Sequence, residues 1–236
     1  MKAPKLKFKF DSKFDLEIAW NFYNSPKYAG IDFWKKGALQ YHDELKVIEK
    51  KQRKKIYLSD YVASLYKQHK DEFEYRRKEI EALYKKKGQQ FFCETEKIFK
   101  NHPWPKGKYI AFLSIFDFCP RFIDDKTFFI FMYDNDKGIL FTIFHEMLHF
   151  IFYDYCLTKY PRIFKNQSTE GGSFWELAEL FNSAIQQTPT FVKLHGQIDG
   201  IGYPELKSKF KEAKKAWNGD IDDWIATFGM RHVENF

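Results

Sequence analysis

Two histidines four positions apart, His145 and His149, form with Glu146 a pentapeptide of the pattern His-Glu-x-x-His. On an α-helix, residues four apart lie on the same face, one turn above each other, so both imidazoles can bind one Zn²⁺. Glu146 lies one position further round the helix, where its carboxylate can hold a water molecule. The apolar flanks 139–144 and 150–153 belong in a core, where these polar groups cost folding energy unless something pairs with them. We therefore expect a metal ion at this segment.

A third metal ligand must come from elsewhere in the chain, because catalytic zinc sites usually have three protein ligands and one open position. The segment 173–185 contains two glutamates, Glu176 and Glu179. On a helix they lie one turn apart on nearly the same face, so either carboxylate could complete the site. Without the upstream histidines, two such glutamates would indicate a solvated helix face.

Together the two segments resemble the gluzincin branch of the zincin metallopeptidases, in which a helix bearing His-Glu-x-x-His is followed by a helix that donates a glutamate. The resemblance covers about residues 128–186. The second-helix pattern Trp-Glu-Leu-Ala-Glu-Leu-Phe-Asn favours Glu179 as the ligand, with Glu176 as the competing choice and Asn182 as a supporting group. Four residues after the ligand, where the family usually carries an Asp or a similar group, this chain has Ser183 counting from Glu179, or Leu180 counting from Glu176.

For a catalytic site, the chemistry assigns a role to each residue. His145 and His149 would bind zinc through neutral imidazole nitrogens, and Glu179 would complete the set as an anionic ligand. A water molecule would fill the fourth position, with its pKa lowered towards about 7 by the metal. Glu146 would take the proton of that water and pass it to the leaving group. Its apolar neighbours would keep its surroundings dry and raise its pKa.

The resemblance also implies that the strand 128–133 hydrogen-bonds an extended peptide substrate, as edge strands do. A group that stabilises the oxyanion is needed as well. The sequence offers five candidates and does not choose among them: Tyr153, Tyr155, Tyr160, His195 and His232. Tyr155 stands where the metzincin branch carries its third histidine, so that branch does not fit.

Hydrophobic patterns predict the elements that position these residues. Strand-like runs at 109–116 and 127–133 precede the histidines, and a turn at 134–138 leads into their helix. Ser173 is the predicted cap of a second helix through 174–187. We expect these strands and helices to form the catalytic core.

The remaining segments are predicted to be mainly helical. Alternation of lysine with leucine or phenylalanine at 5–10 indicates one short strand. Rough helical spacing of apolar residues predicts a long helix at 60–86 and a second at 89–100. Two further helices are expected near the C-terminus, at 203–217 and 220–229.

Composition narrows the class of protein. Of 236 residues, 44% are hydrophobic and 20% aromatic, which is ample for a large core and excludes disorder. The cysteines Cys93, Cys119 and Cys156 form no CxxC pair and indicate reduced thiols, so we expect a cytoplasmic protein. The basic N-terminus has no apolar segment typical of a secretory signal. The apolar run 139–153 is too short for a membrane span and carries charged groups.

The net charge of +7 suits a soluble protein with an acidic partner. The lysine-rich segments 46–58, 84–87 and 206–215 are the candidates for a nucleic-acid surface. Acidic residues interleave in two of them, which is typical of solvated helices, and no recognised nucleic-acid motif appears. Nucleic-acid binding is therefore not expected as the main function.

As a whole, the sequence predicts an α+β, zincin-like metallopeptidase fold with a mainly helical N-terminal portion. We expect one domain over 1–236, with any division near 100–108. The predicted function is zinc-dependent hydrolysis of peptide bonds in a peptide or protein substrate, with one Zn²⁺ bound by both histidines and Glu179 and with Glu146 as general base. The alternative is a catalytically inactive zincin-like binding or regulatory protein that could associate with nucleic acid.

Overall fold

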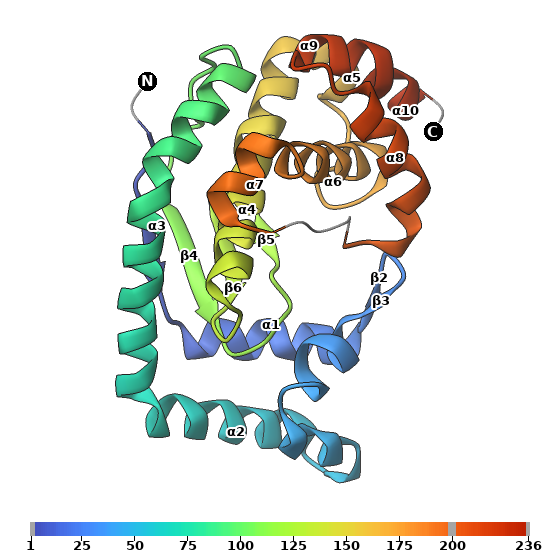
Figure 1. Cartoon of the computed structure of the whole chain (residues 1–236). Coiled ribbons are helices and arrows are strands. Elements are labelled where there is room, and N and C mark those ends of the chain that lie inside the picture. The colour runs from blue at the N-terminus through green and yellow to red at the C-terminus, as the bar shows by residue number, and fades with distance from the viewer. Residues whose placement is uncertain (1–2, 198–201, 235–236) are drawn as a thin grey trace.

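A small mixed sheet and the long helix α4 form the centre of an α+β structure, and the other helices pack around them (Figure 1). The computed structural model describes residues 3–197 and 202–234. The strands are β1 (Leu6–Lys9), β2 (Lys27–Tyr28), β3 (Ile31–Asp32), β4 (Tyr109–Ser114), β5 (Arg121–Phe122) and β6 (Thr127–Phe131). The α-helices are α1 (Ser12–Asn24), α2 (Lys54–Gln68), α3 (Lys70–Ile98), α4 (Asp136–Lys159), α5 (Pro161–Phe164), α6 (Gly172–Gln186), α7 (Pro189–His195), α8 (Lys207–Ala216), α9 (Ile221–Trp224) and α10 (Met230–Glu234). Short π-helical segments lie at Trp34–Leu39 and Ile225–Gly229, and 3₁₀ segments at Asp43–Lys50 and Pro204–Leu206.

The strands of the main sheet lie in the order β1, β4, β6, β5, with the first three parallel and β5 antiparallel to β6. The strand expected at 127–133 is confirmed as β6. Its predicted role as a peptide-binding edge at 128–133 is wrong, because β4 and β5 pair with β6 on its two sides. All residues of β6 are buried, which is typical of an inner strand covered on both faces. The outer strands of the sheet are β1 and β5.

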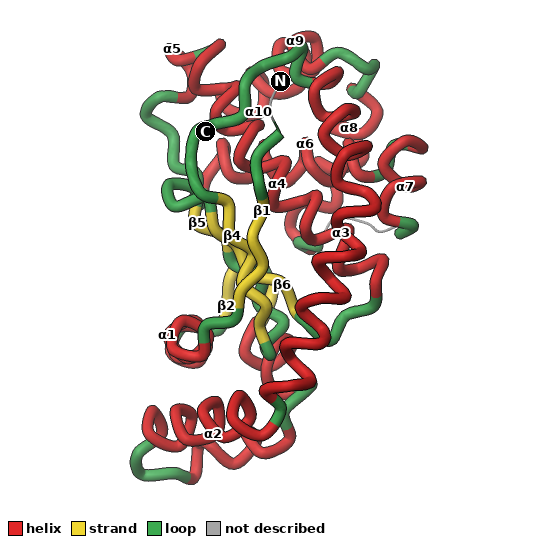
Figure 2. Tube along the Cα trace, turned by 90° about the vertical axis from the view of Figure 1, so that its left-hand side faces the viewer, coloured by secondary structure: helices red, strands yellow, loops and turns green. Residues whose placement is uncertain are grey.

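Helix α4 covers one face of this sheet and α1 covers the other (Figure 2). On the α4 face, the ring of Phe150 packs against Tyr109 of β4 and Phe128 of β6. On the opposite face, Phe14 of α1 packs edge-on against Phe112 of β4. Aromatic side chains on both faces of the strands thus fix α4, and the histidines that it carries, against the sheet.

Helix α4 is buried over most of its length, as expected for a sequence that is apolar all round. Asn135 caps it by accepting hydrogen bonds from the backbone N–H groups of Lys137 and Gly138. Gly138 lets the carboxylate of Asp134 lie against the helix, since a Cβ there would lie 1.9 Å from a carboxylate oxygen and would displace that side chain. The helix predicted to follow the turn at 134–138 is therefore confirmed.

The second predicted helix, 174–187, is confirmed as α6, but it starts differently. The cap is Gly171 and not Ser173, and the helix begins at Gly172. Gly172 has a φ of +76°, a left-handed conformation that glycine adopts without strain, so the chain can turn sharply into the helix. Since α6 packs across α4 and against α8, almost all of its residues are buried.

The N-terminal portion is mainly helical, as predicted, but the helices divide at a different residue. The predicted helices 60–86 and 89–100 would separate near Gly88, whereas the structure separates α2 from α3 at His69. Gly88 stays inside α3, where the ring of Tyr84 lies 3.1 Å from the position of a Cβ. The single long helix α3 then packs against both β1 and α4 (Figure 1).

The remaining helices and the core agree with the expected α+β class. The helices predicted at 203–217 and 220–229 correspond to α8 and to the run from α9 to α10. The hydrophobic core includes side chains from both sides of 100–108, such as Phe91 and Phe150. Within the described part of the chain, no helix combines the length and the apolar character needed to cross a membrane.

The C-terminal segment is tied to the ends of α3 and α4 through Asp222 of α9. Its carboxylate accepts hydrogen bonds from Lys100 at 2.6 Å, from Tyr155 at 2.5 Å and from Tyr160 at 2.7 Å. Burial raises the pKa of Asp222, but Lys100 and the two hydroxyls outweigh it and lower the pKa to about 2. One ionised carboxylate therefore connects three helices.

Candidate metal centre

The structure brings His145, His149 and Glu179 together where α4 and α6 pack against each other. Nε2 of His145 lies 3.1 Å from Oε2 of Glu179 and 3.0 Å from Nε2 of His149. Nε2 of His149 lies 3.4 Å from Oε1 of the same carboxylate. One ligand atom from each residue can be chosen so that all lie within 4.8 Å of one another, a spacing that could hold one metal ion.

Gln186 sets the protonation of His145. Its side-chain amide donates to the backbone carbonyl of Phe141 at 2.8 Å, which directs its oxygen towards His145. That oxygen lies 2.9 Å from Nδ1 of His145 and accepts the Nδ1 proton. The neutral imidazole consequently presents its lone pair at Nε2, as a metal-binding histidine does.

Nε2 of both histidines and Oε2 of Glu179 therefore face one another. No contact fixes the tautomer of His149, because its Nδ1 has no hydrogen-bond partner among the described residues. The hydrogen of a neutral His149 on Nε2, a proton on Nε2 of His145 or a metal ion can each lie among these atoms. Burial lowers the pKa of His145, but the hydrogen bond and charge of Glu179 raise it above its usual value, so a proton can serve. Burial lowers the pKa of His149 well below its usual value, which keeps that ring neutral. Two imidazole nitrogens and a carboxylate oxygen are also ligands that suit Zn²⁺.

Glu146 lies beside this cluster without joining it. Its side chain is 7% exposed, and Oε2 has no hydrogen-bond partner among the described residues. Burial raises the pKa of Glu146 to about 7, against the opposing charges of Arg121 and His145. The flanking Phe144 and Met147 are fully buried, in agreement with the dry surroundings expected from the sequence. A carboxyl group with this pKa can accept and release a proton near neutral pH.

Arg121 of β5 is the residue at this centre that the sequence analysis missed. Its Nη1 forms an ion pair with Oε1 of Glu179 at 2.9 Å, and its Nη2 donates to the hydroxyl of Tyr153 at 3.4 Å. Burial raises the pKa of Glu179, but Arg121 and the neighbouring histidine outweigh it and lower the pKa below its usual value. A signal was present in the sequence, since Asp117 and Arg121 are the only charged residues in 109–123.

Glu176, the competing choice for a third ligand, lies in a different contact. It pairs with Lys209 of α8 at 2.6 Å and with His232 of α10 at 3.2 Å. These contacts connect α6 to the C-terminal helices. The structure thus brings Glu179, and not Glu176, to the histidines.

Tyr153 is the candidate oxyanion stabiliser that lies beside the cluster. Its ring stacks on His149, and its hydroxyl donates to the backbone carbonyl of Thr169 at 3.1 Å. The other four candidates bind partners other than the ligand atoms: Tyr155 and Tyr160 bind Asp222, His195 binds the backbone of Gln186, and His232 binds Glu176.

Two residues of α6 support the site from behind. Asn182 donates its side-chain amide to the backbone carbonyl of His145 at 3.1 Å, so the predicted supporting group contacts the helix and not the imidazole. Ser183, which stands at the family's acidic position, lines a cavity instead. Support for the imidazole comes from Gln186, one turn further along, at a position that the motif does not indicate.

A cavity of about 470 Å³ opens beside the cluster. His145, Glu146 and Glu179 line it, together with residues of other elements: Phe33, Phe118, Cys119, Phe141 and Tyr203. A second cavity of about 390 Å³ has Arg121 in its wall and shares with the first Phe33, Phe118, Cys119 and Tyr203. We call the two cavities, which share these four residues, the cleft; its second part lies beside the edge strand β5.

Comparison with known proteins found no family model, no curated protein and no solved structure that matches this chain.

Proposed function

We propose that this chain is a zinc-dependent metallopeptidase, in which His145, His149 and Glu179 bind one Zn²⁺. The observation that carries the proposal is the convergence, from two helices, of two imidazole Nε2 atoms and one carboxylate oxygen, a ligand set that suits Zn²⁺. The orientation of His145 by Gln186 supports it, because the lone pair then points at the other two ligand atoms.

Glu146 is the proposed general base. Bound zinc would polarise the scissile carbonyl and lower the pKa of a water molecule. Glu146, which lines the same cavity as His145 and Glu179, would take a proton from that water and return it to the amine that leaves. Arg121 holds Oε1 of Glu179, which leaves Oε2 as the ligand atom and keeps the carboxylate from occupying two coordination positions.

The cleft beside β5 supports a peptide substrate. Its first part is lined by His145, Glu146 and Glu179 and its second part by Arg121, so a chain segment could lie across the centre with residues on both sides of the bond to be cut. The edge strand β5 offers backbone groups for an extended substrate, a role that the sequence analysis assigned to β6.

One observation favours the alternative, a zincin-like binding or regulatory protein without turnover. The guanidinium of Arg121 already neutralises Glu179 and lies 3.9 Å from Oε2 of Glu146. A built-in cation of this kind could stabilise the two carboxylates in place of a metal ion.

Metal analysis of the purified chain, together with hydrolysis of a peptide library, tests both functions. The metallopeptidase should contain about one zinc per chain, lose it in His145→Ala, and keep it in Glu146→Gln while hydrolysis stops. Glu176→Gln is the matched control and should leave zinc content and hydrolysis unchanged. Zinc binding without hydrolysis of any peptide would favour the binding protein. No zinc uptake, or unchanged hydrolysis in Glu146→Gln, would overturn the proposed mechanism.

A further inference from the structure

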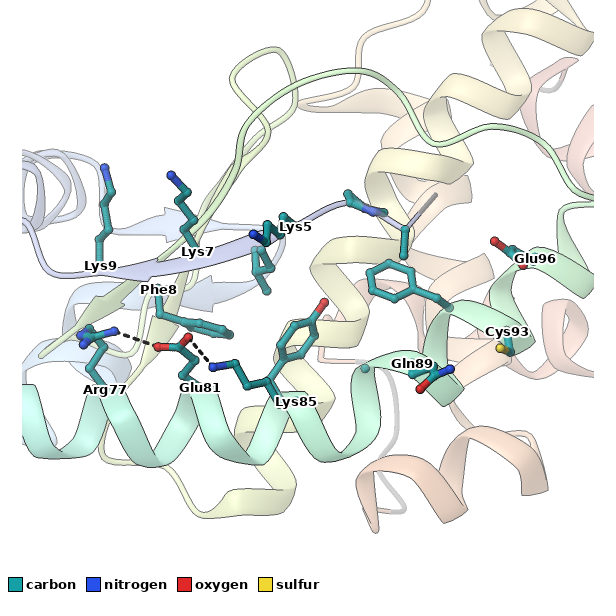
Figure 3. A pocket seen from close by; sticks show the side chains of 16 residues that line it. Lys5, Lys7, Phe8, Lys9, Arg77, Glu81, Lys85, Gln89, Cys93 and Glu96 are labelled. Carbon is teal, nitrogen blue, oxygen red and sulfur yellow. Dashed lines mark hydrogen bonds and ion pairs between the residues drawn. The ribbon is translucent and has the colours of Figure 1, made fainter. Parts of the chain in front are cut away.

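A second hollow, remote from the metal centre, lies between strand β1 and helix α3 (Figure 3). We call it the β1–α3 pocket. Its volume is about 840 Å³, within the range of roughly 300–1,000 Å³ that ligand sites occupy. It shares no lining residue with the cavities beside the metal centre.

The β1–α3 pocket has an apolar part, and the ion-paired side chains Arg77, Glu81 and Lys85 of α3 line it as well. Leu6 and Phe8 line it from β1, and Tyr84 and Phe92 line it from α3. Gly88 leaves a gap in the side chains of α3, because a Cβ there would press on the ring of Tyr84. The hydroxyl of Tyr84 has no hydrogen-bond partner among the described residues, which leaves a donor unsatisfied beside the hollow.

Strand β1 forms one edge of the main sheet, and its only neighbour in that sheet is β4. In the described part of the chain, no other hydrogen bond reaches the backbone of Leu6–Lys9. The outward N–H and C=O groups of β1 are therefore free to pair with another strand. The β1–α3 pocket runs along this free edge, so a strand added there would place side chains into it.

Three exposed lysines, Lys5, Lys7 and Lys9, line the same edge. Figure 3 shows Lys7 and Lys9 pointing away from α3, while Phe8 between them points towards it. The side chains of β1 are therefore basic on one face and apolar on the other. Two copies of this edge would place lysine against lysine, which disfavours self-association of the chain.

We propose that the edge of β1 binds an extended segment of a partner protein in which acidic and apolar residues alternate. The segment adds a fifth strand to the four-stranded sheet. Cross-strand neighbours on one face lie about 4.5–5.5 Å apart, so its acidic residues pair with the lysines. Its apolar residues, on the opposite face, enter the β1–α3 pocket. The net charge of +7 assists the encounter with an acidic partner.

The direct test uses a fluorescein-labelled peptide, Glu-Leu-Glu-Phe-Glu-Leu-Glu, titrated with the full chain and followed by fluorescence anisotropy. The peptide should bind, and Lys7→Glu/Lys9→Glu should weaken binding by at least about tenfold, since like charges would then face each other. The matched control is Lys207→Glu/Lys211→Glu, which makes the same change in net charge on α8 and should bind as the unaltered chain does. Circular dichroism checks that both variants are folded.

Two further peptides separate strand addition from simple charge attraction. A peptide of the same composition with its glutamates in one block, and one N-methylated at alternate residues, should each bind at least about tenfold more weakly. The alternating peptide should also shield Cys93, which is exposed and lines the pocket, from a maleimide. The Cys93→Ser variant measures the background labelling of the other thiols.

The proposal is overturned if the alternating peptide does not bind or if the block or N-methylated peptide binds equally well. Equal weakening in both lysine variants would likewise contradict it, because binding would then follow net charge alone. A single-stranded DNA oligonucleotide is the last comparison. If it bound as tightly as the alternating peptide, and Lys7→Glu/Lys9→Glu abolished that binding, the edge of β1 would be a general anion-binding surface and not a strand-binding edge.

Discussion

Nη1 of Arg121 lies 2.9 Å from Oε1 of Glu179, so an edge strand of the sheet supplies a cation to the centre of the proposed zinc site. This contact divides the carboxylate, with one oxygen bound by arginine and the other facing the histidines. It also brings a fixed positive charge close to the place where a metal ion would bind, and the two cations would repel each other.

Replacing Arg121 should therefore change metal binding and stability in opposite directions. We expect Arg121→Met to bind zinc at least about tenfold more tightly, because a competing charge is removed. Without metal, the variant should lose about 3–5 kcal/mol of unfolding free energy, since two buried carboxylates lose their counter-ion. Competition with a chromogenic chelator and urea unfolding measure the two effects. Arg162→Met, which replaces an exposed arginine on α5, is the control. Weaker zinc binding in Arg121→Met would contradict the prediction, because the Arg121–Glu179 ion pair would then stabilise the bound metal.

Gln186 should act on the metal only through His145. Gln186→Leu removes the acceptor of the Nδ1 proton and should weaken zinc binding by roughly 10–100-fold, as loss of such outer contacts does in other zinc sites. Gln187→Leu tests the neighbouring amide, which accepts a hydrogen bond from Lys214 at the surface, and should change zinc affinity little. Equal affinities of the two variants would remove Gln186 from the site.

Glu176 and Glu179 can be separated by conservative exchange. Glu179→Gln should reduce zinc content from about one ion per chain to near zero, because the anionic ligand is lost. Glu176→Gln should keep the zinc and instead lower stability modestly, since Lys209 and His232 lose a charged partner. Atomic absorption on both purified variants decides between them. Loss of zinc only in Glu176→Gln would reverse the assignment.

Asp15 should make stability depend on pH. It is buried and accepts hydrogen bonds from Ser114, the backbone of Ile115 and Tyr66. Burial raises its pKa from 3.8 to about 6, against these hydrogen bonds. Because the folded state binds this proton more tightly than the unfolded state, the contribution of Asp15 is fully present below about pH 4 and is lost as the pH rises to about 6. The difference corresponds to about 3 kcal/mol.

Urea unfolding of the unaltered chain and of Asp15→Asn, at several pH values between 4 and 7, measures this contribution. The variant should lack the decline of about 3 kcal/mol over that interval, since asparagine does not titrate. If the unfolding free energies of the two proteins changed with pH in parallel, Asp15 would have the same pKa in the folded and unfolded chain, which contradicts the prediction.

The parts of the centre that could be predicted follow from local geometry. His145 and His149 lie on one face because their spacing matches a helical turn, whatever packs beside them. Helix α4 was predictable because its apolar sequence is long and continuous, and α6 because its apolar spacing is regular. Their lengths leave few alternatives to a buried helix.

The missed parts depend on tertiary pairing. The order of strands is not contained in the pattern of any one strand, so β6 could not be distinguished from an edge. Strand β5 has two residues, too few for any periodicity, so the isolated charge of Arg121 was the one available signal and it does not indicate which residue Arg121 would contact. Gln186 is oriented towards His145 by its hydrogen bond to the backbone carbonyl of Phe141 on α4, and no sequence motif connects Gln186 with Phe141.

The carboxylate of Asp222 joins segments that lie between 62 and 122 positions apart in the chain. Opening α9 would remove the acceptor of Lys100, Tyr155 and Tyr160 at the same time and uncover the ends of two long helices. These parts should therefore open as one cooperative unit and not fray separately, and their amide protons should exchange with solvent at a common free energy. The helix that carries the histidines thus gains its rigidity partly from a segment that contributes no ligand.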